Sequence, residues 1–335
     1  CRLWNRTPPI LFNSRCRAVN PGLDRHNWRS FASFLGRRSS SKVIPMVPCT
    51  LNDVQLRSCL RTSCDYSAGN LTYHATRSDI FRGACQLNGV AGRDAAEPWR
   101  VAVAIPAKNE SEGILASLSA TSAAITSSRL RGGIVLVVND AGDATFELAR
   151  AWLWHGTVPY IVADVGFGRA SSVGMARRFA LDIGANQVSN PQAILLTTDA
   201  DSTPAPDWIE KSVRALSSGA DVVCGTIDGD PKEIAALPEP LKLRGADEAE
   251  YMRLTLELSA GLDPLPHLPY PHHGTVSGAN LAFSQLVYRD IGGMPAVPCG
   301  EDRAFVRRAE ARDWRIGFHD DVRVTTSYRL TGRAR

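Results

Sequence analysis

Short apolar runs alternate with longer amphipathic segments from about residue 99 to the C-terminus. The amphipathic segments predict helices over residues 110–125, 144–154, 170–183 and 206–217. The apolar runs are typical of buried strands and cover residues 100–105, 134–138, 158–162, 193–197 and 221–224. Strands that alternate with helices in this way predict an α/β domain, in which helices cover both faces of a mainly parallel sheet.

The first 95 residues show neither of these periodicities. They contain thirteen Arg and one Lys against five Asp, so this stretch carries a net charge of about +9, although the whole chain carries only +4. Six of the eight cysteines also lie here. We therefore predict two parts: a basic, Cys-rich extension over residues 1–95, and a folded domain over residues 99–335. The extension is expected to be poorly ordered, or translated from upstream of the native start.

Three other interpretations of the extension have less support. A zinc site needs paired ligands, and Cys59 and Cys64 are the only close pair of cysteines. A disulfide framework needs an oxidising compartment, and no signal peptide is visible. Arginine excess without interleaved aromatic residues is weak evidence for nucleic-acid binding. The sequence therefore predicts a cytoplasmic protein with no nucleic-acid partner.

Polar residues follow three of the predicted strands at the point where each strand ends. The segments are PAKNE at 106–110, NDAGD at 139–143 and TDAD at 198–201. Each alone is compatible with a turn or a helix cap, since Asp and Asn favour both. Parallel strands end at the same edge of a sheet, and open α/β sheets bind their ligands at that edge. The three segments together therefore predict a binding site there.

Asp199 and Asp201 are the most informative pair of residues in these segments. Alternation in an extended segment points both carboxylates the same way, which suits a hard cation or a metal–diphosphate unit. Mg²⁺ commonly takes one or two carboxylates and completes its shell with water and phosphate oxygens. The alternative is a turn that caps the helix beginning near Pro206, because two Asp at this spacing are common by chance.

The order and spacing of several motifs resemble those of the family 2 glycosyltransferases. The motifs are IPAKNE, VVNDAGDAT, GRASSVGMA, LLTTDADSTPAPDWI, SGANLAFS, and GGM followed by GED, and they span residues 101–326. This resemblance implies a GT-A fold, which is a Rossmann-like, mainly parallel sheet with helices on both faces. It also implies a nucleoside-diphosphate sugar as donor, a divalent metal such as Mn²⁺ or Mg²⁺, and inversion at the anomeric carbon.

The resemblance also implies roles for residues around the donor nucleotide. The first-strand motif, which includes Pro106, Ala107 and Glu110, would form a wall of the nucleotide pocket. Asp140 matches the carboxylate that meets the base or ribose, although Asn139 stands where relatives commonly have Asp. Three further groups are placed by the same match: Arg169 near the nucleotide, Gly278 and Asn280 beside the donor sugar, and Arg329 and Arg333 near the diphosphate.

The remaining implied roles concern the metal and the acceptor. Asp201 would be the main metal ligand, with Asp199 as a second ligand nearer the ribose. Asp302 of the GED motif would be the general base that deprotonates the acceptor hydroxyl, and Glu301 would help to bind the acceptor. The alternative for this pair is an acidic first turn of a helix over residues 301–311, where a negative charge favours the helix dipole.

The sequence therefore predicts a metal-dependent, inverting hexosyltransferase with a carbohydrate, lipid or small-molecule acceptor. It has no membrane span, and peripheral membrane association and the oligomeric state stay open. The histidines of PHLPYPHHGT have poor spacing for a metal and are expected to line a loop near the acceptor. Relatives often continue beyond GRAR, so we expect a domain truncated at its C-terminus. The two alternatives are a sugar nucleotidyltransferase, which normally opens with a Gly-rich loop, and a non-catalytic nucleotide-sugar-binding protein.

Overall fold

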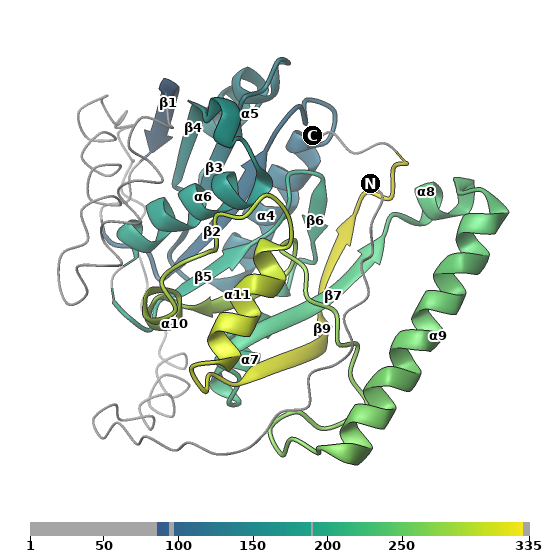
Figure 1. Cartoon of the computed structure of the whole chain (residues 1–335). Coiled ribbons are helices and arrows are strands. Elements are labelled where there is room, and N and C mark those ends of the chain that lie inside the picture. The colour runs from purple at the N-terminus through teal and green to yellow at the C-terminus, as the bar shows by residue number, and fades with distance from the viewer. Residues whose placement is uncertain (1–85, 94–96, 189, 331–335) are drawn as a thin grey trace. The chain divides into compact units, whose positions relative to one another are not determined.

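The structure, a computed structural model, describes residues 86–93, 97–188 and 190–330. All of them belong to the compact unit Lys42–Arg335, and the other unit, Cys1–Ser41, lies outside the described residues. The described residues form one nine-stranded sheet in the order β1-β4-β3-β2-β5-β8-β7-β9-β6 (Figure 1).

Four neighbouring parallel strands form the part of the sheet that the sequence predicts best. They are β4 (Tyr160–Gly166), β3 (Gly132–Asn139), β2 (Val101–Ala107) and β5 (Ile194–Thr197). All residues of β2, β3 and β5 are buried, because helices cover both faces. Such strands read as continuous apolar runs, which is how they appear in the sequence. The predicted mainly parallel α/β architecture is confirmed.

The other strands extend this sheet on both sides. β8 (Leu281–Ser284) pairs antiparallel with β5 and with β7 (Val222–Gly229). β9 (Ile316–Thr326) runs parallel to β7, and the short β6 (Ser202–Pro204) pairs antiparallel with the end of β9. This last pairing matters for the site, because it places the residue before β6, Asp201, beside Thr326.

The strand β1 (Gln86–Arg93) corrects the predicted start of the folded domain. It lies inside the segment assigned to the extension, yet it pairs antiparallel with β4, for example Val90 with Ala163. The sheet therefore begins upstream of the predicted boundary at residue 99. Glycines at 89 and 92 weaken the strand pattern of the sequence, and the partner strand β4 supplies the hydrogen bonds that make it a strand. The rest of the extension, residues 1–85, lies outside the described residues.

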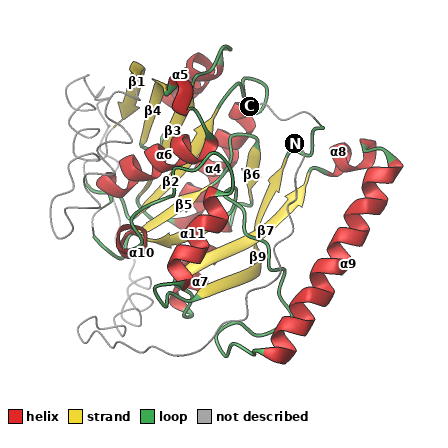
Figure 2. Cartoon of the chain, in the orientation of Figure 1, coloured by secondary structure: helices red, strands yellow, loops and turns green. Residues whose placement is uncertain are grey.

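Helices pack on both faces of the sheet (Figure 2). On one face, α6 (Val173–Gln187) crosses β2, β3 and β5, and it shares a core with α10 (Gln285–Asp290) and α11 (Glu301–Glu310). On the other face, α4 (Ile114–Ser128) contacts both α5 (Thr145–His155) and α7 (Trp208–Ser217). Twelve of the fifteen residues of α6 are buried, so its polar residues need partners inside the protein.

Two helices that the sequence analysis did not predict connect β7 to β8. The short α8 (Pro231–Ala236) leads into α9 (Glu239–Leu262), which has no buried residue. Leucines occur around the circumference of α9 rather than in one stripe, and for this reason the helical periodicity was not visible in the sequence. None of the helices in the described part of the chain is both long and apolar enough to cross a bilayer.

Candidate active site

A cavity of about 390 Å³ lies at the edge where β2 and β5 end. This volume falls in the range of small-molecule sites, roughly 300–1,000 Å³. Lys108, Asn139 and Ser171 also line the cavity, although no role was predicted for them. Six of the residues selected from the sequence line it: Pro106, Ala107, Glu110, Asp199, Asp201 and Arg329. The predicted convergence of polar residues at this sheet edge is therefore observed for the segments after β2 and β5 and, through Asn139, for the segment at the end of β3.

Asp199 and Asp201 both line the cavity but contact different partners. The segment after β5 is a turn rather than an extended strand, so alternation does not set the directions of the two side chains. The Asp199 carboxylate accepts a hydrogen bond from Arg177 at 2.6 Å, and the Asp201 carboxylate lies 2.9 Å from Arg329. Burial raises the pKa of Asp201, the Asp199 charge raises it further, and Arg329 and Thr326 oppose the shift.

Arg329 joins two parts of the cavity wall. Its guanidinium contacts the Glu110 carboxylate at 2.6 and 3.3 Å and the Asp201 carboxylate at 2.9 Å. Glu110 follows β2 in the chain, Asp201 follows β5, and Arg329 follows β9, so three strand ends meet at this point. Arg329 was predicted to bind a diphosphate, and in this structure its partners are carboxylates.

Arg177 is a central residue of the site that the sequence analysis did not identify. It lies on α6 with only 2% of its side chain exposed, and it donates hydrogen bonds to four groups. Burial alone would lower the pKa of Arg177, but the charges of Asp199 and Glu301 raise it. The available sequence signal was that charged residues, Arg177 among them, interrupt a largely apolar helical segment. Its four acceptors are Asp199, Glu301, the Thr197 hydroxyl and the Gly278 carbonyl oxygen.

Glu301 and Asp302 begin α11, as expected of a helix over residues 301–311. Glu301 is buried, and its carboxylate pairs with the Arg177 guanidinium at 3.0 Å. Its partner in this structure is thus a side chain of the protein itself. Asp302 is partly exposed and accepts a hydrogen bond from the Gly278 N–H at 3.0 Å. Gly278 is therefore hydrogen-bonded to two residues of the site: its N–H donates to Asp302, and its carbonyl oxygen accepts from Arg177.

Gly278 has no room for a side chain, which leads to a stability prediction. A Cβ at this position would lie 2.6 Å from Cζ of Arg177. Four hydrogen bonds hold that guanidinium, so it cannot move away without losing partners. We expect Gly278→Ala to lower the free energy of unfolding by about 1–3 kcal/mol, the usual effect of overpacking. A urea titration measures the difference.

Gly142→Ala is the matched control for this variant. Its added Cβ would meet no atom within 4 Å. A surface substitution of this kind should change the free energy of unfolding by less than about 0.5 kcal/mol. Equal stability of the two variants would contradict the close contact at Gly278.

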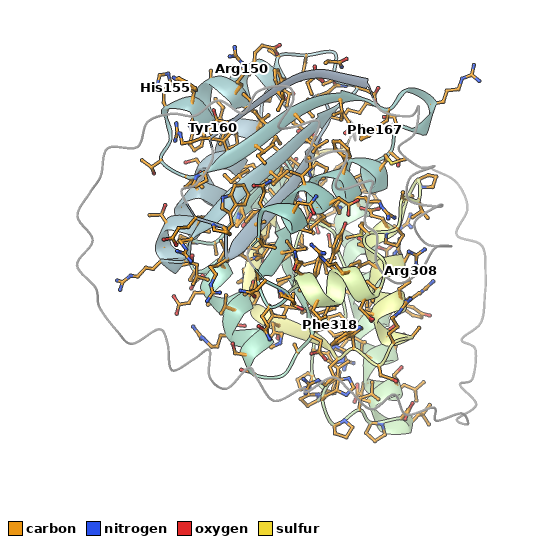
Figure 3. The ribbon with its side chains drawn as sticks, turned by 90° about the vertical axis from the view of Figure 1, so that its left-hand side faces the viewer. Arg150, His155, Tyr160, Phe167, Arg308 and Phe318 are labelled. Carbon is orange, nitrogen blue, oxygen red and sulfur yellow. The ribbon has the colours of Figure 1, made fainter. Side chains whose placement is uncertain are left out.

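Two of the predicted nucleotide ligands lie outside the cavity lining. The Asp140 carboxylate accepts hydrogen bonds from the backbone N–H groups of Phe167 and Gly168, both at 3.1 Å. Burial would raise the pKa of Asp140, but the hydrogen bonds, with that of Ser171 the largest, lower it. Arg169 lies in the short 3-10 turn Gly168–Ala170, where it is exposed. The structure thus places both residues beside the carboxyl end of β4, which Phe167 marks in Figure 3.

The remaining predicted ligands are placed as follows. Asn280 is 1% exposed, and its amide bonds to the Trp208 indole and to the carbonyl oxygens of Thr226 and Val322. It therefore ties β8 to its neighbours rather than facing the cavity. Arg333 lies outside the described residues.

The carboxylates of the cavity fit a divalent metal. Asp199 and Asp201 offer hard oxygen donors, and the pair matches the one or two carboxylates that Mg²⁺ takes alongside phosphate oxygens and water. The two carboxylates line the same cavity, where a divalent ion could reach both. Within the described residues, no group of three or more His, Cys, Asp or Glu is placed to hold a metal. Asp201, with Asp199, would hold such an ion.

The loop that contains the three histidines packs against β9. His272 stacks on the ring of Phe318, with ring centroids 4.8 Å apart, and Nε2 of His273 lies 3.2 Å from the carbonyl oxygen of Cys224. Figure 3 labels Phe318 on this part of the sheet. Burial lowers the pKa of both histidines. Their expected proximity to an acceptor stays a prediction.

Two comparisons of the sequence identify related proteins. Residues 102–265 match the family model described as "Glycosyl transferase family 2". The chain is also 26% identical over 222 residues to the glycosyltransferase AglE of Haloferax volcanii. That alignment covers 60% of this chain and 68% of the relative.

Solved structures with a similar fold include two sugar-nucleotide complexes. S. aureus TarS 1–349 in complex with UDP-GlcNAc is 14% identical with a TM-score of 0.48, covering 70% of this chain and 60% of that chain. The mannosyltransferase PcManGT from Pyrobaculum calidifontis, in complex with GDP-Man and Mn²⁺, is 17% identical with a TM-score of 0.48. The second match covers 84% of this chain and 69% of that chain. This chain thus spans less than two thirds of the length of TarS 1–349.

Proposed function

Because residues 102–265 belong to glycosyl transferase family 2, we propose that this chain transfers a sugar from a nucleoside-diphosphate donor to an acceptor hydroxyl. The family and the GT-A type of α/β fold predicted from the motifs are thereby confirmed. The donor class, the metal and the stereochemistry form the proposal.

One observation carries the proposal: the two Asp carboxylates share a cavity with Glu110 and Arg329, and Arg177 connects Asp199 to Glu301 of the GED motif. The cavity provides acidic groups for a metal and a basic group for phosphate oxygens. Arg177 bonds Asp199 and Glu301 at the same time, so the proposed donor side and acceptor side share one buried cation. A glycosyl transfer needs both sides in fixed relative positions.

Each group has a specific task in the proposed reaction. Pro106, Ala107 and Glu110 form the wall against which the nucleotide lies, and Asp302 accepts the proton of the acceptor hydroxyl as that oxygen attacks the anomeric carbon. The bond from the anomeric carbon to the diphosphate breaks as the new bond to the acceptor forms on the opposite face, which inverts the configuration. A divalent ion at Asp201 and Asp199 would stabilise the negative charge on the departing diphosphate.

A donor screen tests this function with the full chain. Nucleoside-diphosphate sugars that differ in base and sugar are mixed with the protein, with and without Mn²⁺ or Mg²⁺. The melting temperature and the release of nucleoside diphosphate are then measured. We expect at least one donor to raise the melting temperature more with metal than without, and to be hydrolysed slowly. Proton NMR of a transfer product gives its anomeric configuration.

Other results of this screen would favour the alternatives. Pyrophosphate release from a nucleoside triphosphate and a sugar 1-phosphate would indicate a nucleotidyltransferase. Donor binding without any turnover would indicate a non-catalytic binding protein. The acceptor class and the cytoplasmic location stay predictions.

Removing Asp201 should abolish the metal dependence of donor binding. At a free ligand concentration of one hundred times Kd, binding stabilises the folded state by about 2.7 kcal/mol. In Asp201→Ala the metal loses its main protein ligand, so we expect this metal-dependent part of the stabilisation to disappear. Thermal unfolding with nucleoside diphosphate and Mn²⁺ measures it. Asp207→Ala is the control, because Asp207 lies after β6 and pairs with Lys211. A full metal response in the Asp201 variant would contradict the assignment.

A further inference from the structure

Arg329 occupies the position next to Asp201 that the proposed function gives to a metal ion. Its Nη2 atom lies 2.9 Å from Oδ2 of Asp201 and 2.6 Å from Oε1 of Glu110. Both carboxylates are largely buried, with 19% and 9% of the side chain exposed, so neither is well screened by water. One guanidinium therefore pairs with both acidic groups on this side of the cavity.

The fold holds Arg329 at this position from a different part of the chain. Thr326 ends β9 and its hydroxyl lies 3.4 Å from Oδ1 of Asp201. Arg329 follows Thr326 by three residues, so the end of β9 brings it close to this carboxylate. Ser327 donates to Glu233 of α8 at 2.8 Å, and the backbone N–H of Tyr328 donates to the same carboxylate. These contacts anchor the backbone before Arg329, while its long side chain can change direction without moving β9.

A metal ion and this guanidinium compete for the same carboxylate. Metal coordination at Oδ2 of Asp201 requires the lone pairs that now accept from Arg329, and two cations at one carboxylate repel each other. The other carboxylate of the pair does not offer Arg329 a substitute, because Asp199 is bonded to Arg177. An arginine released from Asp201 has a suitable partner in the cavity once a donor is bound, since a guanidinium binds phosphate oxygens in a forked geometry.

We propose that Arg329 is a tethered cation that holds the metal position in the metal-free enzyme and exchanges with the metal when the donor binds. In the metal-free state it pairs with Asp201 and Glu110. In the donor complex the metal takes Asp201, and Arg329 contacts the diphosphate. This proposal rests on the proposed function, and it gives Arg329 opposite effects on two ligands: it weakens binding of the metal alone, and it strengthens binding of the nucleoside diphosphate.

The opposite signs make the test specific. Binding of Mn²⁺ alone to the full chain is measured by isothermal titration calorimetry for wild type and Arg329→Gln. Binding of UDP and of GDP is then measured at saturating Mn²⁺. We expect Arg329→Gln to bind Mn²⁺ alone about tenfold more tightly, within the ~5–150-fold range of coupling between ligands. We expect it to bind the nucleoside diphosphate that wild type prefers about tenfold more weakly, because a charge-assisted hydrogen bond is lost.

Lys108→Gln is the charge-matched control. Lys108 lines the same cavity, its Nζ donates to the Ser171 hydroxyl at 3.5 Å, and its charge helps to lower the pKa of Asp140. Lys108→Gln removes one positive charge from the cavity, as Arg329→Gln does, but it leaves the pair of Arg329 and Asp201 in place. We expect less than about a twofold change in Mn²⁺ affinity, because solvent and salt screen the repulsion between the Lys108 charge and the metal. Equal gains in both variants would show a general charge effect and overturn the exchange.

Asp201→Ala separates this proposal from the proposed function. Loss of Mn²⁺ binding in Asp201→Ala, together with tighter binding in Arg329→Gln, supports both. Loss in Asp201→Ala with unchanged or weaker Mn²⁺ binding in Arg329→Gln overturns the exchange and leaves the metal site intact. Undiminished Mn²⁺ binding in Asp201→Ala overturns the metal site itself, and the exchange with it.

Discussion

Asp302→Asn is expected to lower kcat by about 10²–10⁴-fold, which is the usual contribution of a general base. The amide has the size of the carboxylate but cannot take the acceptor's proton at neutral pH. Donor affinity should change little, because Asp302 lies outside the cavity lining formed by the two Asp carboxylates and Arg329. The measurements are steady-state kcat with the donor found by the screen, and the dissociation constant of that donor.

The structure also allows the structural effect of this substitution to be separated from the catalytic one. Asp302 accepts from the N–H groups of Gly278 and Arg303, at 3.0 and 2.7 Å through its two oxygens. Asparagine has one acceptor oxygen, so one of these hydrogen bonds is lost, at a cost in stability of about 0.5–1.5 kcal/mol. A protein that stays folded at the assay temperature then reports on catalysis alone.

Glu310→Gln is the matched control, since it removes one carboxylate from the far end of the same helix. We expect its kcat to stay within about twofold of wild type, because it makes no contact with the GED motif's first turn. Near-normal turnover in a folded Asp302→Asn protein would refute the base assignment, and Glu301 would be tested next.

Arg177→Met is expected to lower the free energy of unfolding by about 3–5 kcal/mol, the range for removing one partner of a buried ion pair. Methionine fills much of the volume of arginine but leaves Asp199 and Glu301 without their buried cation. It also leaves the Thr197 hydroxyl and the Gly278 carbonyl without a donor. Denaturant unfolding of the metal-free protein measures the loss.

Arg178→Met is a useful comparison on the same helix. Arg178 is also buried, and it donates to the carbonyl oxygens of Met294 and Gly292 and lies 3.6 Å from Asp182. Both variants should lose stability, but only Arg177→Met should also change Mn²⁺ affinity, because only Arg177 contacts Asp199. Equal metal binding by the two variants would show that Arg177 serves packing alone. Glu301→Gln in the Arg177→Met background should recover part of the stability, since one of the unpaired charges is then removed.

The regular part of the fold could be predicted because its strands are buried on both faces. Continuous apolar runs marked β2, β3, β4 and β5, and helices α4 to α7 fall where amphipathic segments were expected. The beginnings of these helices differ by a few residues for local reasons. The helix expected from residue 110 starts at Ile114, after Asn109 takes a left-handed conformation, and the one expected from 170 starts at Val173, after Ser172 caps it.

Other elements could not be predicted because their patterns depend on neighbours distant in the chain. β1 and β6 are strands through the partners that they find in β4 and β9. α9 buries no residue, so no stripe of apolar positions distinguishes it. The residues of β1 and β6 do not predict a strand without their partner strands. The residues of α9 show no apolar stripe, because this helix packs no buried face against the domain.

By itself, the sequence determined the α/β class, the edge of the sheet at which the candidate site lies, and the resemblance to the family. Strand periodicity and the residues after strand ends are local properties, and motif order is read along the chain. Only the tertiary structure decided which side chains meet there. Arg329 and Glu110 are 219 residues apart, and Arg177 and Glu301 are 124 apart. Strand order and helix packing bring such residues together, so the partners of a charge depend on the folded arrangement rather than on any local pattern.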